Sequence, residues 1–272
     1  MEFLDYLNHG FIQRALLAGS FIAVSCSALG VFLVLRRLSL IGDGLAHVTF
    51  GGVALAMLLG VLPLYVAIPV VMASSVAILK LVERARVFGD AAIGMVSSLG
   101  IAGGIVLASV AGGFNIDLFS YLFGNILAIG TSEVITSLGL SVGVILIVVL
   151  LFHELLSLTF DEESARASGI KTGRINTVLV LLTAVTVVMA MKVVGIMLIS
   201  SLLIVPPVTA LQLARSFKGT MVTAAVVSVL SVVIGTALSI ALDAPTGATI
   251  VILNFIFFVL SLGYRQVRQK AG

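Results

Sequence analysis

The sequence predicts an all-α, polytopic transmembrane helical bundle of about eight or nine spans, and three observations support this prediction. The chain of 272 residues is 60% hydrophobic and only 10% charged, whereas soluble domains are roughly half apolar and about a quarter charged. Its mean hydropathy is +1.28. The apolar residues also form runs long enough for helices to cross a bilayer core of about 30 Å. We therefore expect residues 1–272 to form a single transmembrane domain with short loops.

Nine apolar segments are candidate spans, because a helix that crosses the bilayer needs about 20 predominantly apolar residues. They are residues 11–35, 45–61, 64–81, 91–111, 133–152, 175–191, 194–213, 221–242 and 248–262. The turn that joins the second and third spans is very short. A further apolar segment, residues 117–129, is too short to cross. The sequence therefore leaves the count at eight or nine.

The lysines and arginines indicate how the spans are oriented. When the loops are assigned alternately to two sides, one side receives 13 basic residues and the other only Arg14 and Lys192. Basic residues are enriched in cytoplasmic loops, so the first side is cytoplasmic. This orientation places the N-terminus and the turn around residues 242–246 outside, and the C-terminus inside.

Small residues and prolines indicate how the spans pack. Lipid gives helices no hydrophobic drive to associate, so close packing relies on small residues. Candidates for such contacts are Gly51, Gly52, Gly100, Gly104, Gly139 and Gly143. Pro206 and Pro207 lie inside the seventh span, where each removes a backbone hydrogen bond. A broken helix suits a transport pathway, but kinked helices also occur without that role.

The stretch RRLSLIGDGLAHVTFGGVA, residues 36–54, contains the main candidate site. Asp43 and His47 are four residues apart, so a helix places their side chains on one face. Ionisable groups at membrane depth are costly and mark ion pathways. Carboxylate oxygen and imidazole nitrogen together suit Zn²⁺ and Mn²⁺. Alternatively, Asp43 is only the N-cap of the second span at the interface.

A polar cytoplasmic segment has the start and stop signals of a short helix. Thr159 is the expected N-cap, acids at residues 161–163 lie in the first turn, and Gly169 follows the end. Such a helix lies along the membrane surface, where a soluble partner can dock. A capped loop helix without a partner has the same signals.

The sequence gives no sign of an enzyme. It contains no GxxxxGK[ST] phosphate-binding run, and its serines, histidines and acids are too scattered among the spans to suggest a hydrolase. If ATP drives transport through this chain, we expect a separate subunit to hydrolyse it.

Five segments, taken together and in this order, resemble the membrane permease subunit of zinc/manganese ATP-binding cassette importers. They are RRLSLIGDGLAH, DLFSYLFGNILAI, LTFDEESARASGI, AMKVVGIMLISSLLIVPPVTA and DAPTGATIVI. The resemblance extends over essentially the whole chain. It implies a multi-pass protein of a bacterial-type cytoplasmic (inner) membrane that imports Zn²⁺ or Mn²⁺, with Fe²⁺ as a third candidate, and binds no permanent cofactor.

The resemblance also implies partners and site residues. The partners are a second permease, a cytoplasmic ATPase and an extracytoplasmic metal-binding protein. The second permease forms a dimer with this chain and is another copy of it or, in some members, a related chain. The segment from Thr159 to Gly169 then docks on the ATPase as a coupling helix. Asp43 and His47 become metal ligands in the pathway, and Asp243 a third ligand or an external gate. Asp243 lies in an external DAPTG turn, where forming the turn is its default role.

The positions of these residues create a difficulty for a shared site. Asp43 begins the second span near its cytoplasmic end, whereas Asp243 is external. They can share one site only if the second helix starts deep in the membrane, after an extended segment at residues 38–42. Non-helical backbone is allowed at that depth where it lines a cavity.

Two other function classes stay open. One is a stand-alone secondary carrier or channel, although the docking loop and the lack of coupling-ion residues count against it. The other is a membrane scaffold that binds a cytoplasmic ATPase and transports nothing. Metal flux separates them, because only an importer loses transport when its ATPase is inactivated.

Overall fold

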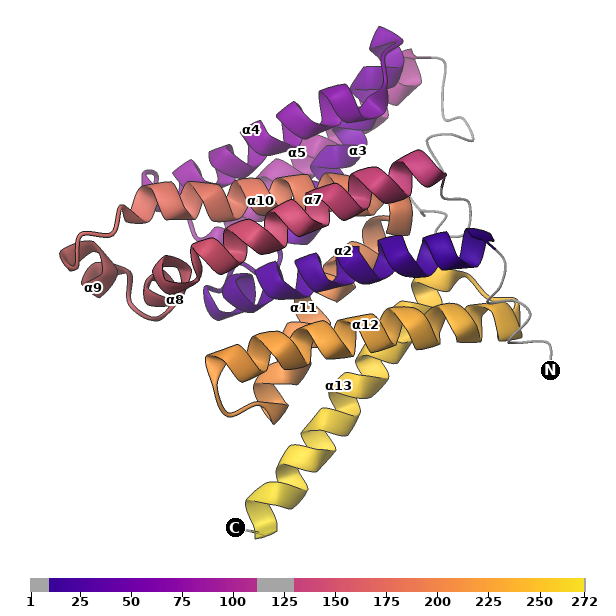
Figure 1. Ribbon diagram of the computed structural model, residues 1–272. Coiled ribbons are helices and arrows are strands. Elements are labelled where there is room, and N and C mark those ends of the chain that lie inside the picture. The colour runs from indigo at the N-terminus through magenta and orange to yellow at the C-terminus, as the bar shows by residue number, and fades with distance from the viewer. Residues whose placement is uncertain (1–9, 112–129, 272) are drawn as a thin grey trace.

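The computed structural model describes residues 10–111 and 130–271, and every element in these ranges is helical (Figure 1). Eight of the described helices are long and apolar enough to cross a membrane. They are α2 (Gly10–Leu35), α3 (Ile41–Leu59), α4 (Pro63–Glu83), α5 (Gly89–Val110), α7 (Thr131–Leu150), α10 (Thr172–Val194), α12 (Phe217–Leu242) and α13 (Thr246–Ala271). A ninth helix, α11 (Ile196–Leu213), has a shorter apolar stretch. The predicted all-α bundle of eight or nine spans is confirmed, and segment 117–129 lies outside the described residues.

The most buried helices, α2, α3 and α10, form the centre of the molecule. α3 packs chiefly against α5 and α4, whereas α2 packs against α12, α7 and α11. In Figure 1, α3, α4 and α5 accordingly lie on one side of α10, and α11, α12 and α13 lie on the other. The outer helices expose large apolar side chains such as Val106, Leu146 and Phe255. Helices that are apolar on all faces are expected inside a membrane.

The short helices of the chain lie at one end of the bundle. In Figure 1 the short helices α8 (Phe152–Phe160) and α9 (Glu162–Ala167) lie on the same side as the C-terminal end of the chain, opposite the N-terminal end. The basic residues assign this side to the cytoplasm.

Glycines allow close contact between some of the helices. A Cβ atom on Gly51 of α3 would lie 2.7 Å from the carbonyl oxygen of Gly100 on α5, so the two backbones touch. Gly52 similarly faces Ala67 of α4. By contrast, no described atom lies within 4 Å of a Cβ built on Gly139 or Gly143 of α7. These two glycines therefore do not pack against the described helices of the same chain.

α11 runs without interruption through Pro206 and Pro207, so the prolines do not divide it into two helices. Pro207 has no N–H to donate to the carbonyl of Leu203. That carbonyl packs against α2, since its oxygen would lie 2.1 Å from a Cβ built on Gly30. Gly30 therefore leaves room for the carbonyl of Leu203, which Pro207 deprives of its usual helical hydrogen bond.

Most helix ends lie within four residues of the predicted boundaries, and three differences are larger or change the assignment of a residue. The expected span at residues 133–152 ends earlier, at Leu150, and a separate helix, α8, follows it. α8 contains Thr159, whose hydroxyl donates to the carbonyl of Leu155, so the prediction that Thr159 is an N-cap is wrong. α13 continues to Ala271 rather than ending near residue 262, because its polar end is rich in Arg, Gln and Lys, which are good helix formers.

The N-cap of α9 is Asp161, whose carboxylate accepts hydrogen bonds from the backbone N–H groups of Glu163 and Ser164. The backbone of Asp161 is extended (φ −154°, ψ 103°), which separates α8 from α9. The predicted end is correct: Gly169 has a positive φ of 87° and follows the helix in the left-handed conformation that glycine favours. The predicted short helix in this polar segment is therefore confirmed, and its cytoplasmic location stays a prediction.

Candidate functional site

The turn between α2 and α3 sets the position of the candidate site. Two backbone hydrogen bonds close the end of α2. The N–H of Leu38 donates to the carbonyl of Leu33, and the N–H of Arg37 donates to the carbonyl of Val34. This pattern closes a helix around a residue in the left-handed region, here Arg37 with φ 59°. A turn at residues 39–40 follows, and α3 begins at Ile41. Residues 38–42 therefore do not form the extended segment considered above.

Asp43 lies within the first turn of α3 rather than before it. The N-cap of α3 is Leu40, and no side chain caps the helix. The alternative interpretation, in which Asp43 serves only as an N-cap, is therefore wrong. A carboxylate in the first turn still interacts favourably with the helix dipole.

Asp43 and His47 are adjacent, as their spacing predicts. His47 Nε2 lies 3.6 Å from Asp43 Oδ2, and Asp43 Oδ1 accepts a hydrogen bond of 2.9 Å from the hydroxyl of Ser200 on α11. The Asp43 side chain is 44% exposed and the His47 side chain 31%. The residues between and beside them on α3 are buried: Ile41, Gly42, Gly44, Leu45, Ala46 and Val48. In the first two turns of α3, Asp43 and His47 are therefore the side chains that remain accessible, while the residues around them are buried.

Two glycines flank Asp43 and fix the start of α3 between neighbouring helices. A Cβ on Gly42 would lie 2.2 Å from Cδ1 of Leu203 on α11, and one on Gly44 would lie 2.6 Å from Cγ2 of Ile93 on α5. α11 and α5 therefore press against the backbone on either side of Asp43. This packing holds the carboxylate beside Ser200.

Sequence reasoning missed the polar residues that α11 and α13 supply. The next serine after Ser200, Ser201, accepts a hydrogen bond of 3.1 Å from Nδ2 of Asn254 on α13. Both side chains are buried, and Oδ1 of Asn254 has no hydrogen-bond partner among the described residues. The available signal was an adjacent pair of serines and an asparagine inside otherwise apolar runs, where polar groups are costly.

Asp243 occupies a different kind of position. It caps the C-terminus of α12 in the left-handed conformation (φ 49°, ψ 44°) and is exposed. The turn it forms is closed by the Ser239 hydroxyl, which bonds to the carbonyl of Ala244 and to the hydroxyl of Thr246. Within the described residues, no group of three or more His, Cys, Asp or Glu side chains converges. The structure therefore brings Asp43 and His47 together in one chain, and the role of Asp243 stays a prediction.

The Asp43–His47 pair offers one carboxylate and one imidazole to a cation. Ligands of these two types suit first-row divalent ions. A site on a transport pathway must bind weakly enough to release its ion, and two protein ligands leave coordination positions free. The geometry fits transient binding better than the closed four-ligand coordination of a structural zinc site.

The comparisons with known proteins agree with a membrane protein that transports divalent metal ions. The model of the ABC 3 transport family matches residues 8–265. A manganese transport system membrane protein, MntC of Halalkalibacterium halodurans, is 33% identical over 95% of this chain and 89% of its own length. A high-affinity zinc uptake system membrane protein, ZnuB of Haemophilus influenzae, is 34% identical over 93% of this chain and 97% of its own length. The solved structure of PsaBC from Streptococcus pneumoniae in complex with Fab is 32% identical, with a TM-score of 0.86 over 96% of this chain and 94% of that one.

Proposed function

Because this chain belongs to the ABC 3 transport family, we propose that it is the permease subunit of an ATP-driven importer of divalent transition-metal ions. Mn²⁺ and Zn²⁺ are the first candidates, since similar proteins are named for manganese and for zinc transport, and Fe²⁺ is a third. The chain is a multi-pass membrane protein of the bacterial inner-membrane type. Its part in transport is to form the pathway, and a separate subunit hydrolyses ATP.

The observation that carries the proposal is the Asp43–His47 pair. It lies half-exposed on a helix whose other residues at that level are buried. We assign both residues as ligands that bind the ion during its passage. Asp243 is proposed as an external gate that contacts the ion before it reaches this pair, because residues 38–42 do not form the extended segment that a shared site requires. A second copy of the chain completes the pathway, because the described residues of one chain bring together only Asp43 and His47, fewer ligands than a transition metal takes.

Three partners follow from the proposal. The segment from Thr159 to Gly169, with α9 at its centre, docks on a cytoplasmic ATPase. α9 suits this role because Glu163, Ser164 and Arg166 are exposed while Ala165 is buried against the bundle. An extracytoplasmic metal-binding protein delivers the ion, and a second permease copy forms the dimer.

The test is metal import by the complete importer reconstituted in vesicles, with Asp43→Asn and His47→Gln compared with the parent. We expect each variant to import Mn²⁺ or Zn²⁺ at least about tenfold more slowly, because even changes that only reorient a metal ligand cost about 10–100-fold. Asp90→Asn is the matched control, since Asp90 is an exposed acid in the first turn of α5. Parental import by both pair variants, with ATP hydrolysis intact, would contradict the assignment.

The same vesicles separate the other two function classes. An importer stops transporting when its ATPase is inactivated, whereas a stand-alone carrier or channel continues. A scaffold transports no metal in any combination of subunits.

A further inference from the structure

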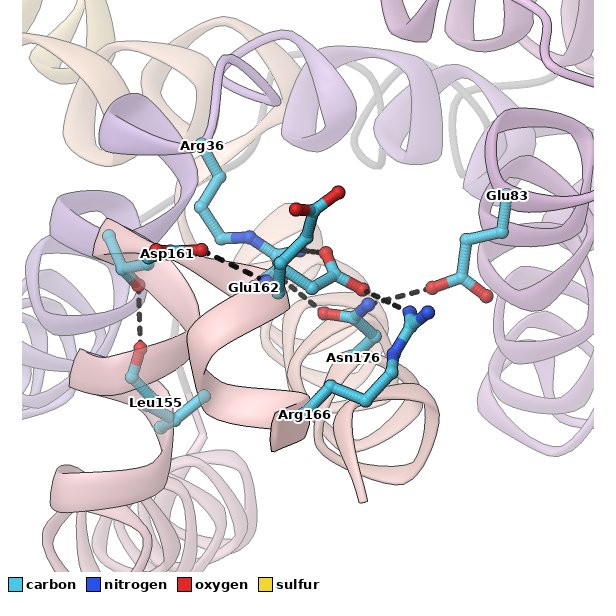
Figure 2. A network of polar contacts seen from close by, with 9 residues as sticks. Arg36, Glu83, Leu155, Asp161, Glu162, Arg166 and Asn176 are labelled. Atoms are coloured by element: carbon cyan, nitrogen blue, oxygen red, sulfur yellow. Dashed lines mark hydrogen bonds and ion pairs between the residues drawn. The ribbon is translucent and has the colours of Figure 1, made fainter. Parts of the chain in front are cut away.

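At the cytoplasmic end of the bundle, four polar side chains join four helical segments, as Figure 2 shows. We call Arg36, Glu83, Glu162 and Asn176 the Arg36 cluster. Arg36 follows the last residue of α2, Glu83 ends α4, Glu162 begins α9, and Asn176 lies near the start of α10. The cluster therefore links α9 to three helices of the bundle.

The contacts in the cluster form a continuous chain. Arg36 Nη2 lies 3.3 Å from Glu162 Oε2, and Arg36 Nη1 donates to Asn176 Oδ1. Asn176 Nδ2 in turn donates to Glu83 Oε1 at 2.7 Å. Asn176 therefore uses its acceptor toward Arg36 and its donor toward Glu83, so its amide has a single productive orientation. Glu162 also contacts Arg166, but that contact stays inside α9.

Burial distinguishes this cluster from an ordinary surface ion pair. The Arg36 side chain is only 13% exposed, and Asn176 is buried. Burial lowers the pKa of the Arg36 guanidinium from its ordinary value, and the carboxylates of Glu162 and Glu83 oppose that shift. A buried cation depends on its acceptors far more than an exposed one does. Glu162, which supplies the contact with α9, is 37% exposed, so water screens part of this ion pair. The buried guanidinium still depends on Glu162 as one of its acceptors.

The cluster adjoins the helix that carries the proposed transit site. A cavity of about 120 Å³ is lined by Arg36, Glu162 and Ile41, the first residue of α3, among others. This volume has room for a few water molecules at about 30 Å³ each, so apolar packing does not fill the space between α9 and α3. Asp43 follows Ile41 by two residues. The polar contacts of Arg36 are therefore one route by which a displacement of α9 reaches the start of α3, beside the packing of α10 against both helices.

We propose that Arg36 and Asn176 are positioning residues that transmit displacement of α9 to the α2–α3 turn, and so to the helix that presents Asp43 and His47. This rests on the function proposed above, and adds to it the path by which ATPase docking acts on the metal site. α9 is held through its first residue, Glu162, and α3 through the turn that contains Arg36. Asn176 and Glu83 anchor the same guanidinium to α10 and α4, which serve as the fixed frame.

The experiment measures metal ions imported per ATP hydrolysed by the reconstituted importer. Arg36→Lys keeps the charge, but a single ammonium cannot reproduce the fork that reaches Asn176 and Glu162 together. Glu162→Gln keeps the shape of the side chain and removes its charge. We expect each variant to retain assembly with the ATPase and ATP hydrolysis, and to import at least about fivefold less metal per ATP. Arg37→Lys, the same change at an exposed neighbouring residue, is the control and should match the parent.

The double variant Arg36→Lys/Glu162→Gln tests whether the two residues act as one path. Its loss should be no greater than that of the more affected single variant, since coupled residues are not additive. A metal-to-ATP ratio equal to that of the parent in both single variants overturns the proposal. So does a loss of metal import that only follows a loss of assembly or of thermal stability, because that is a structural role. If the parental complex imports no metal at all, the proposed function itself is contradicted.

Discussion

At the scale of single residues, the candidate site divides into a part that spacing predicts and a part that it cannot. Asp43 and His47 are neighbours because they are four residues apart on one helix, and the structure places them 3.6 Å apart. The contact from Ser200 to Asp43 joins residues 157 positions apart. No local periodicity encodes such a contact, because it depends on how α11 packs beside α3.

Asp243 shows how one residue type satisfies two requirements. Its backbone has φ 49°, a conformation that costs most L-residues roughly 1–2 kcal/mol and that Asp and Asn adopt more readily. The turn alone therefore accounts for an aspartate at this position. A role in metal transport needs the carboxylate as well.

The two roles of Asp243 are separated by comparing Asp243→Asn with Asp243→Ala. The Asn variant keeps a residue that tolerates this turn and loses the carboxylate, whereas Ala strains the turn. We expect Asp243→Asn to unfold at the parental temperature and to import metal more slowly, because a gate or ligand needs the charge. Asp243→Ala should also lose about 1–2 kcal/mol of stability. Thermal unfolding and vesicle uptake provide the two measurements, and parental uptake by Asp243→Asn would leave the residue with its turn role alone.

At the scale of helices, apolar length predicted the existence of the spans better than their ends. Hydropathy marks the part of a helix that lies in lipid, so it could not predict that α13 extends through Arg265 to Ala271. The N-cap of α9 was misplaced for a related reason. Thr159 and Asp161 are both residues that cap helices, and the structure uses Asp161 because α8 occupies the chain up to Phe160.

Among the described glycines, an added Cβ would make its shortest contact at Gly30, where α2 packs against α11. A Cβ on Gly30 would meet the carbonyl oxygen of Leu203 at 2.1 Å and Cγ of Pro207 at 2.8 Å. Neither the backbone nor a proline ring can move aside as a flexible side chain does. We expect Gly30→Ala to destabilise the bundle by about 1–3 kcal/mol, the usual range for overpacking.

Thermal unfolding of the purified chain in detergent measures this effect. Gly103→Ala on α5 is the matched control, since a Cβ there meets no described atom within 4 Å. In a helix interior that change should be neutral or slightly stabilising, because Ala is the better helix former. If Gly30→Ala and Gly103→Ala unfold at the same temperature, the close contact between α2 and α11 is not present in solution.

At the scale of the whole molecule, composition determined the fold class because a chain with apolar side chains in lipid has few ways to satisfy its polar backbone. Every backbone polar group in the bilayer core must be satisfied internally, which favours helices for long apolar runs. Helix order and number follow from those runs. The apolar runs do not predict that α2, α3 and α10 lie at the centre, because every span is apolar and hydropathy cannot rank the spans by burial. Gly51 and Gly100 were recognisable as packing residues, but their pairing across α3 and α5 was not.

The orientation of the bundle also belongs to the whole chain, because it rests on 13 basic residues on one side and two on the other. The chain has one cysteine, Cys26, which is buried, so replacing it with Ala gives a background for single-cysteine labelling.

Val61 is 45% exposed in the turn between α3 and α4, and Ser216 is exposed between α11 and α12. In intact cells, a thiol reagent that cannot cross the membrane should label Val61→Cys and leave Ser216→Cys unlabelled. Permeabilised cells should label both, which controls for accessibility. Labelling of Ser216→Cys alone in intact cells would invert the topology and place α9 outside, where no ATP is available to a docked ATPase.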